Sequence, residues 1–344
     1  MPEDQGQDQD RHQDAAGTFE AHRRHLFGLA YRLLGSAADA DDVMQDAFLR
    51  WNATDRAAVA NPAAWLTRVV TNLCLTELTS ARQRRERYTG TWLPEPVLTG
   101  ADAAAGGGHG ELGPLETVQQ RESVSMAMLL LLEELTPPER AVFILHEAFG
   151  YRYAEIAEIL GKTEAACRQL ARRAARRIGP AAKFTGRFTP SARDEQARWH
   201  RLTDGFLAAA AAGDVAALEK LLAQDVVSWS DGGGKFPAGA RPVLGRHKVA
   251  RVLAALGYAL GSDAPAATGV QRALAAVRAA GLTFTAAEVN GSPALLGWSG
   301  GAVFAVIVPV VTADGITALY SVANPDKLTW ITRQASRNAG PPSQ

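Results

Sequence analysis

The 344-residue sequence predicts a multidomain protein, with two all-α helical domains followed by an α+β domain. Three observations support this order. Apolar residues recur at three- and four-residue spacing over residues 19–88, and again over residues 116–185. Residues 282–323 instead contain four successive segments typical of β-strands. A chain of this length holds two or three domains, each able to bury its own core.

Charge is segregated along the chain. The 36 Lys and Arg residues balance the 36 Asp and Glu residues, so the net charge is zero. Basic runs nevertheless lie at 82–87 and 168–187, and acidic runs lie at 1–14 and 39–46. Because binding to nucleic acid depends on local charge, a neutral chain of this kind remains a candidate for it.

The cysteines and the hydropathy pattern indicate a cytoplasmic protein. Cys74 and Cys167 lie in different segments and suggest neither a disulfide framework nor a zinc site, so we expect no metal and no cofactor. No apolar run approaches the roughly twenty residues of a membrane-spanning helix, and the acidic, polar N-terminus is unlike a signal peptide. We therefore expect a soluble chain without a membrane partner.

The first helical domain follows a tail, residues 1–18, whose Gln, Asp and Gly content predicts disorder. Its helices are expected at 19–35, 38–52 and from Pro62 to about residue 87. The second helix is acidic in its first turns, where the helix dipole favours carboxylates. Its outer face is a small anionic patch suited to a basic partner. That patch consists of Asp41, Asp42, Gln45 and Asp46.

The second helical domain, residues 116–185, contains a helix-turn-helix pattern between Leu135 and Ile178. Thr136 is a candidate N-cap for a helix in which Val142, Phe143, His146 and Phe149 share one face. Gly150 and Gly161 end the first two helices. A short helix, a glycine-bearing turn and a second helix with a charged face are typical of DNA-binding domains.

The third helix of this pattern is capped by Thr163 and is strongly basic. Its first residues are placed to contact base edges in a major groove, whereas later arginines suit phosphates. A solvated arginine face on an ordinary bundle helix is the alternative. The candidates are Thr163, with Arg168 and Gln169 for bases and Arg172 and Arg173 for the backbone.

These segments resemble the extracytoplasmic-function (ECF) sigma factors of bacterial RNA polymerase, in the sigma-70 family. The resemblance rests on DADDVMQDAFLRW at 39–51, NPAAWLTRVVTNLCLTELTSARQRR at 61–85 and the helix-turn-helix that follows. WLPEP at 92–96, DGGGK at 231–235 and NPDKL at 324–328 narrow it to the SigJ-type group, which has a SnoaL-like C-terminal extension. Residues 19–88 then correspond to region 2 and residues 116–185 to region 4.

The resemblance implies the partners of each region. Core polymerase, through its β′ and β subunits, and promoter DNA are the expected partners of a chain that is monomeric when free. The acidic helix of region 2 would bind the β′ coiled coil, and region 4 would bind the −35 element. Trp65 has a spacing that favours core packing over stacking on bases. The residues implied for the −10 element are Asn61, Arg68, Asn72, Arg82, Arg84 and Arg85.

Residues 89–115 contain several prolines and a GGG triplet, so we expect a linker and not a packed element. WLPEP within it is stiff, extended and apolar, and should dock in a groove. The sequence does not decide whether WLPEP docks on polymerase, on the C-terminal domain or on its own domain. The motif residues implied as a regulatory interface are Trp92, Leu93, Pro94, Asp231, Gly232, Gly233, Gly234, Lys235, Asn324, Pro325, Asp326, Lys327 and Leu328.

The C-terminal domain, residues 197–335, follows a linker at 186–196 and precedes a flexible tail at 336–344. Helices first and a long antiparallel sheet afterwards predict an α+β cone around a pocket, similar to the SnoaL/NTF2-like fold. Asp231 is expected to form a turn, with Asp326 and Lys327 exposed in another. The resemblance implies that both motifs face the sigma regions and regulate them in place of a separate anti-sigma protein.

Three functions remain open from the sequence. The first is a sigma factor without catalysis of its own, modulated in cis by the C-terminal domain. The second is a ligand-responsive helix-turn-helix regulator, although such proteins generally need a dimer element that this sequence does not obviously contain. The third is a SnoaL-type enzyme acting on a small molecule in the pocket. Its candidate polar residues, with no pair spaced for acid–base work, are His200, Asp231, Arg246, His247 and Glu288.

Overall fold

The computed structural model describes most of the chain. The described residues are 3–86, 88–99, 123–179, 201–202, 204–210, 212–236, 241–261, 279, 281–312 and 314–338. They divide into two compact units. The first combines Met1–Glu86 with Ala101–Lys183, and the second combines Arg87–Gly100 with Phe184–Gln344.

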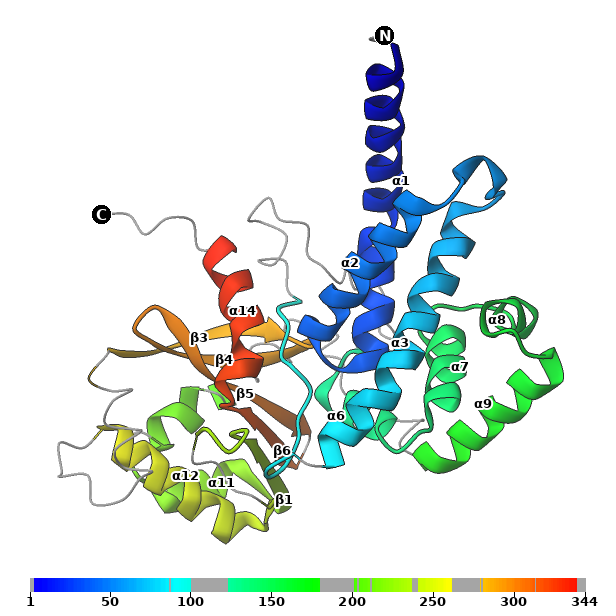
Figure 1. The fold of residues 1–344 in the computed structure, drawn as a ribbon. Coiled ribbons are helices and arrows are strands. Elements are labelled where there is room, and N and C mark those ends of the chain that lie inside the picture. Colours follow the sequence, from blue (N-terminus) through cyan, green and yellow to red (C-terminus); the bar gives the residue numbers. More distant parts are fainter. Residues whose placement is uncertain are drawn as a thin grey trace. The chain divides into compact units, whose positions relative to one another are not determined.

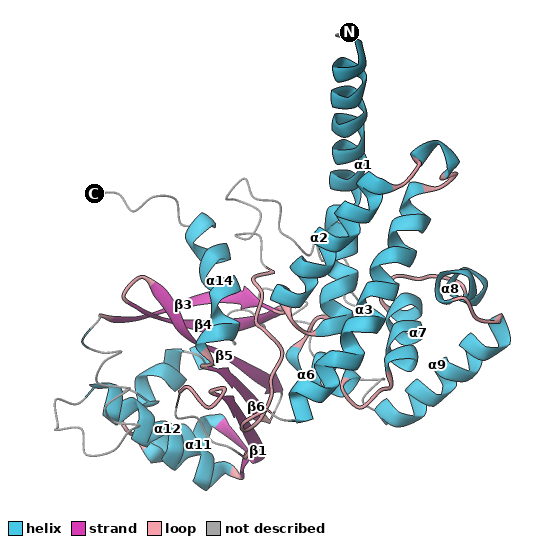
Figure 2. Ribbon diagram, viewed as in Figure 1, coloured by secondary structure: helices cyan, strands magenta, loops and turns pink. Residues whose placement is uncertain are grey.

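The first unit is helical throughout (Figures 1 and 2). Its N-terminal helices pack on one another around buried side chains such as Tyr31, Met44, Trp51 and Leu66. These helices are α1 (Glu3–Leu34), α2 (Ala37–Ala53) and α3 (Pro62–Glu86), with a short 3-10 helix η1 (Arg56–Ala58) before α3. They are followed by α6 (Met126–Leu132), α7 (Pro137–Glu147), α8 (Tyr153–Leu160) and α9 (Glu164–Ile178).

Helix α1 begins at Glu3 and so includes most of the stretch that the composition predicts as a disordered tail. Residues 3–18 contain no proline, and a helix already nucleated by a packed segment extends by adding one residue at a time. The buried part of α1 starts at Phe19, where the predicted apolar stripe begins.

The turn between α7 and α8 contacts the N-terminal helices of the same unit. The Tyr151 hydroxyl lies 3.3 Å from His25 Nε2 and 3.3 Å from Thr67 Oγ1. The Phe149 ring meets the His25 ring edge-on at 4.9 Å, and the Arg32 guanidinium lies 5.2 Å from the centre of the Phe149 ring. The helix-turn-helix is therefore packed against α1 and α3 in this unit.

The second unit is an α+β domain built on one six-stranded sheet. The strand order is β2-β1-β6-β5-β4-β3, and its neighbours are antiparallel except for the parallel pair β1 and β6. The predicted late strands are confirmed. The strands are β1 (Leu222–Asp231), β2 (Val243–Leu244), β3 (Leu282–Val289), β4 (Ser292–Ser299), β5 (Ala302–Thr312) and β6 (Gly315–Val322).

Helices cover this sheet. A core around Val226, Val249 and Leu319 joins it to α11 (Val215–Leu221) and α12 (Arg246–Gly261). The last helix, α14 (Pro325–Asn338), packs along β5. Because β1 and β6 are parallel neighbours, their C-terminal ends lie side by side at the same end of the strands. There Asp231 pairs in register with Val322.

Candidate functional site

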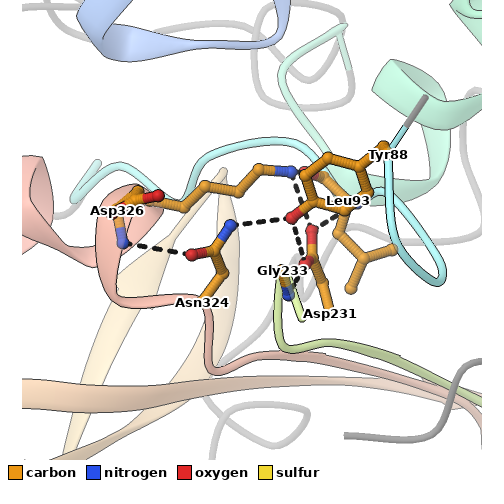
Figure 3. A network of polar contacts seen from close by, with 7 residues as sticks. Tyr88, Leu93, Asp231, Gly233, Asn324 and Asp326 are labelled. Carbon is orange, nitrogen blue, oxygen red and sulfur yellow. Dashed lines mark hydrogen bonds and ion pairs between the residues drawn. The ribbon is translucent and has the colours of Figure 1, made fainter. Parts of the chain in front are cut away.

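The DGGGK, NPDKL and WLPEP motifs meet in the second unit around one carboxylate (Figure 3). Asp231 ends β1 and is fully buried. Its Oδ2 lies 2.7 Å from Lys327 Nζ and accepts a 2.8 Å hydrogen bond from the Leu93 backbone N–H. Its Oδ1 accepts hydrogen bonds from the Tyr88 hydroxyl at 2.5 Å and the Gly233 N–H at 3.0 Å.

Lys327 completes this network. Its Nζ also donates to the Leu93 carbonyl, and it lies 4.3 Å from the centre of the Trp92 ring and 4.8 Å from that of Tyr88. A buried ammonium needs this combination of opposite charge, acceptor and aromatic faces to offset its loss of hydration. The Asn324 amide donates a 2.7 Å hydrogen bond to the Tyr88 hydroxyl.

The backbone that follows WLPEP pairs with the β3–β4 hairpin. The Val97 N–H donates to Asn290 Oδ1 at 3.2 Å, and the Asn290 N–H donates to the Val97 carbonyl at 3.0 Å. Thr99 pairs with Glu288 through both backbone and side chain at 3.0 Å, and Leu98 forms an isolated bridge to Val289. We call residues 88–99 the docked segment, because the positions from Leu93 to Leu98 are all buried.

Of the docking sites left open for WLPEP, the structure shows the C-terminal domain: Leu93 is buried and residues 87–100 belong to the second unit. One expectation about these motifs is wrong. Lys327 is 6% exposed and not on a solvated turn, because Pro325 starts α14 and points this residue at Asp231. By contrast, Lys235 and Asp326 form an exposed pair at 2.7 Å, as their predicted outward charges suggest.

The middle of DGGGK needs glycine for two reasons. Gly233 has φ +61°, a left-handed conformation that side chains disfavour. A Cβ there would also lie 2.4 Å from the Asn324 amide. The motif is therefore the place where the Asn324 side chain passes over the backbone to reach Tyr88.

The environment of Tyr88 keeps its hydroxyl protonated. Burial raises the pKa of this phenol, and the hydrogen bond to the Asp231 carboxylate raises it further. The neutral phenol is the form that donates to Asp231, so docking and protonation favour each other.

The predicted acidic patch lies on α2. Ser36 caps this helix by accepting a 3.1 Å hydrogen bond from the Asp39 N–H. Asp42, Gln45 and Asp46 are exposed, whereas Asp41 is half-buried and interacts with Arg23 at 3.5 Å. Partial burial raises the pKa of Asp42, and the carboxylates of its neighbours raise it further. Leu49, 64% exposed, continues this face one turn later.

The residues predicted for the −10 element are spread along α3. Asn61 Oδ1 accepts a 3.1 Å hydrogen bond from the Ala64 N–H, so this amide caps the helix. Arg68 and Asn72 are exposed, and Asn72 borders a groove of about 620 Å³ lined also by Leu75, Thr76, Thr79 and Ser80. The Trp65 ring lies 5.4 Å from that of Trp51, which fits core packing. The side chains of Arg82, Arg84 and Arg85 lie outside the described residues.

The helix-turn-helix has the local geometry that its sequence predicts. Thr136 forms a capping box with Glu139 at the start of α7. Gly150 at φ +69° allows the turn after α7, and Gly161 at φ +62° caps α8. Thr163 accepts a 3.2 Å hydrogen bond from the Ala166 N–H, so its hydroxyl serves as the N-cap of α9.

The charged face of α9 is exposed over Arg168, Gln169, Arg172 and Arg173. Arg168 forms an ion pair with Glu164 at 2.5 Å. The opposite face of α9 buries Cys167, Ala174 and Ile178, so four arginine or glutamine side chains point away from the core of the unit.

Comparison with known proteins identifies these helical regions. The family model described as Sigma-70 region 2 matches residues 18–85, and the model described as Sigma-70, region 4 matches residues 125–178. Over 313 residues the chain is 41% identical to the ECF RNA polymerase sigma factor SigJ of Mycobacterium tuberculosis, a match that covers 90% of this chain and 92% of the relative. The chain belongs to the ECF sigma factors of the sigma-70 family.

Two further matches agree with this assignment. A probable ECF sigma factor SigI of Mycobacterium tuberculosis is 34% identical over 212 residues, which cover 62% of this chain and 68% of that relative. The crystal structure of Mycobacterium tuberculosis SigJ matches with a TM-score of 0.63 and 36% identity, covering 92% of this chain and 98% of that one. The predicted family, fold class and promoter-directing function are confirmed.

Among the described residues of this sigma factor, the polar side chains that the sequence offers for catalysis have separate partners. Asp231 is occupied by the docked segment, and Glu288 contacts Thr99. His247 pairs with Glu219 at 2.6 Å on the surface, Arg246 is half-buried, and His200 lies outside the described residues. Among the described residues there is no group of three His, Cys, Asp or Glu that could hold a metal ion, and no helix long and apolar enough to cross a membrane.

Sequence reasoning missed several residues of this sigma factor. Tyr88 lies outside any motif, and Asn290 and Gln334 contribute side chains that accept hydrogen bonds from the Val97 and Leu98 N–H groups. Only the position of Tyr88, four residues before Trp92, hinted that it belongs to the same segment. The contacts of Tyr151 with α1 and α3 have no signature in the sequence.

Proposed function

We propose that the C-terminal domain controls this sigma factor in cis by holding the segment that connects its two promoter-binding regions. The supporting observation is the buried network in which Asp231 and Lys327 bind the backbone of Leu93 from both sides. The docked segment follows directly after region 2, since α3 ends at Glu86. With residues 88–99 held, residues 100–122 remain as the connection to region 4.

Each region then has a separate partner. The carboxylates of α2 suit a basic surface, and we assign them to the coiled coil of the β′ subunit in the cytoplasmic core polymerase. Asn61, Asn72 and Arg68 on α3, with the arginines at its end, are assigned to the −10 element. Region 4 is assigned to the −35 element beside the β subunit, with base contacts from Arg168 and Gln169 and phosphate contacts from Thr163, Arg172 and Arg173.

Control acts on geometry and needs no reaction of its own, so we propose no catalysis by this chain. A shorter connection restricts the range of distances at which regions 2 and 4 bind their elements together. The docked form should therefore prefer a narrow range of spacer lengths between the two elements. Release of the segment should broaden that range.

The test is run-off transcription by core polymerase with the full chain or with a chain ending after residue 190, on promoters whose spacer is varied by single base pairs. We expect a sharp optimum for the full chain and a broader profile for the truncated one. Identical profiles would refute control through the docked segment. Absence of promoter-specific initiation by both proteins would contradict the assignment of promoter binding.

A further inference from the structure

On the region 4 helix-turn-helix the His146 ring is stacked on the Tyr153 ring, and the Arg168 guanidinium lies over the same Tyr153 ring. We call these three side chains, which come from three helices, the stack. The His146 ring, near the end of α7, lies on the Tyr153 ring at the start of α8, with centroids 4.4 Å apart and planes 25° apart. On α9, the Arg168 guanidinium lies 5.8 Å from the centre of the same Tyr153 ring. The stack thus links a side chain within α7 to the first turns of the recognition helix.

Both ends of the stack have further restraints. His146 Nδ1 lies 3.0 Å from the Tyr151 carbonyl oxygen, which sets the orientation of the imidazole ring. Arg168 Nη2 lies 2.5 Å from Glu164 Oε1, one turn earlier on α9. The Arg168 side chain is still 57% exposed, so a guanidinium that is held on two sides faces solvent with its remaining donors.

We propose that Tyr153 is a positioning residue that orients Arg168 for contact with a guanine in the −35 element. The proposal rests on the assignment of α9 to that element. Guanine presents two acceptors, O6 and N7, to the major groove, and a planar guanidinium binds them with two parallel hydrogen bonds only in one orientation. A guanidinium already held over a ring loses less rotational freedom when it binds.

The ion pair of Arg168 with Glu164 is compatible with this proposal. Its carboxylate occupies Arg168 in the absence of DNA, and the paired acceptors of a guanine edge can replace it. Tyr153 does not compete for those donors, because the ring offers its face. The ring therefore continues to support the guanidinium when Glu164 is exchanged for the base.

The experiment uses the full chain with core polymerase and a promoter pool randomised over the −35 element, with initiation measured for every sequence. The variants are Tyr153→Leu, Tyr153→Phe, Arg168→Ala and the double variant Tyr153→Leu/Arg168→Ala. Arg176→Ala, which removes an exposed α9 cation outside the stack, is the matched control. Cation–π contacts at exposed sites correspond to about a two- to five-fold effect.

We expect Tyr153→Leu to lower the preference for guanine at one position by about two- to five-fold, and Tyr153→Phe to retain it. Arg168→Ala should abolish the preference, and Tyr153→Leu should add nothing in that background. Arg176→Ala should weaken all sequences about equally. An equal loss on all sequences for Tyr153→Leu, or additive effects of the two substitutions, would overturn the proposal.

A second measurement needs no substitution at Tyr153. In the wild-type chain the Arg168 Nε–Hε resonance, assigned by its loss in Arg168→Lys, should be shifted upfield by the ring current of Tyr153. A resonance at the position of a solvated arginine would overturn the stack. Wild-type initiation that ignores the −35 sequence would instead refute the −35 assignment and the proposal together, whereas −35 dependence unaffected by Tyr153→Leu would refute the stack alone.

Discussion

Lys327 Nζ lies 2.7 Å from Asp231 Oδ2, and the two side chains are 8% and 0% exposed. A second ion pair between the same two motifs, Lys235 with Asp326, has the same separation but side chains that are 58% and 64% exposed. Because the strength of an ion pair depends on its surroundings, these two pairs offer a matched comparison.

Replacing Lys327 by Met should release the docked segment, since it leaves a buried carboxylate without its cation. Breaking a buried pair in this way costs about 3–5 kcal/mol. Hydrogen exchange of the Leu93 and Val97 amides in the full chain measures the effect, and we expect it to accelerate by at least about 100-fold. Lys235→Met should change exchange by less than about 5-fold, and equal effects of the two substitutions would contradict the role of the buried pair.

Gly233→Ala should also weaken binding of the docked segment, through the contact of Asn324 with Tyr88. The new methyl group would meet the Asn324 amide, whose displacement removes the hydrogen bond to Tyr88. Gly301 has a similar φ of +78° with nothing near its missing side chain, so Gly301→Ala carries the backbone strain alone. Urea unfolding should show that both variants lose more than about 1 kcal/mol of unfolding free energy. Hydrogen exchange of the Leu93 amide should be faster only in Gly233→Ala.

High pH should dissociate the docked segment through Tyr88. Because the pKa of this phenol is raised in the docked state, its contribution to docking is complete below the ordinary tyrosine pKa of about 10 and is lost as the pH rises through the raised value. At a pH near 11, Tyr88 of the otherwise wild-type chain should still be protonated, so Tyr88→Phe should leave the tyrosinate absorbance at 295 nm unchanged. In the Lys327→Met background the released Tyr88 should be ionised, so Tyr88→Phe should lower that absorbance. A decrease in both backgrounds would contradict the raised pKa.

Neutralising the exposed carboxylates of α2 should slow binding to core polymerase. For the double variant Asp42→Asn/Asp46→Asn we expect an association rate about 10-fold lower at low salt, with a smaller difference at high salt. Asp225→Asn, which removes one exposed carboxylate from β1, is the control for loss of a surface charge outside α2. The idea fails if both proteins bind at the same rate.

The sequence was sufficient to predict the helices of regions 2 and 4, the glycine-bearing turns and the late strands, because these depend on local periodicity and backbone conformation. It was insufficient for Lys327. A lysine in a turn-like motif is normally solvated, and only the parallel pairing of β1 with β6 places Asn324 and Lys327 beside Asp231. Such long-range pairing leaves no trace in the spacing of residues.

The α7 face illustrates a smaller error of the same kind. Its predicted apolar face was Val142, Phe143, His146 and Phe149. Of these, α7 buries only Val142, together with Ala141, Ile144 and Leu145. Periodicity located the helix but set its rotation wrongly, because His146 and Phe149 have aromatic partners elsewhere in the unit. The contacts of Tyr153 with Arg168 were invisible for the same reason.

The bridge between Leu98 and Val289 has a consequence for the behaviour of the protein in storage and in the cell. Strand β3 is the last strand of its sheet, and the docked segment covers the end of that strand. Uncovered strand edges recruit other chains, so molecules that lose this cover should aggregate with time. The contact that we propose as a restraint on promoter choice should therefore also protect the protein from self-association.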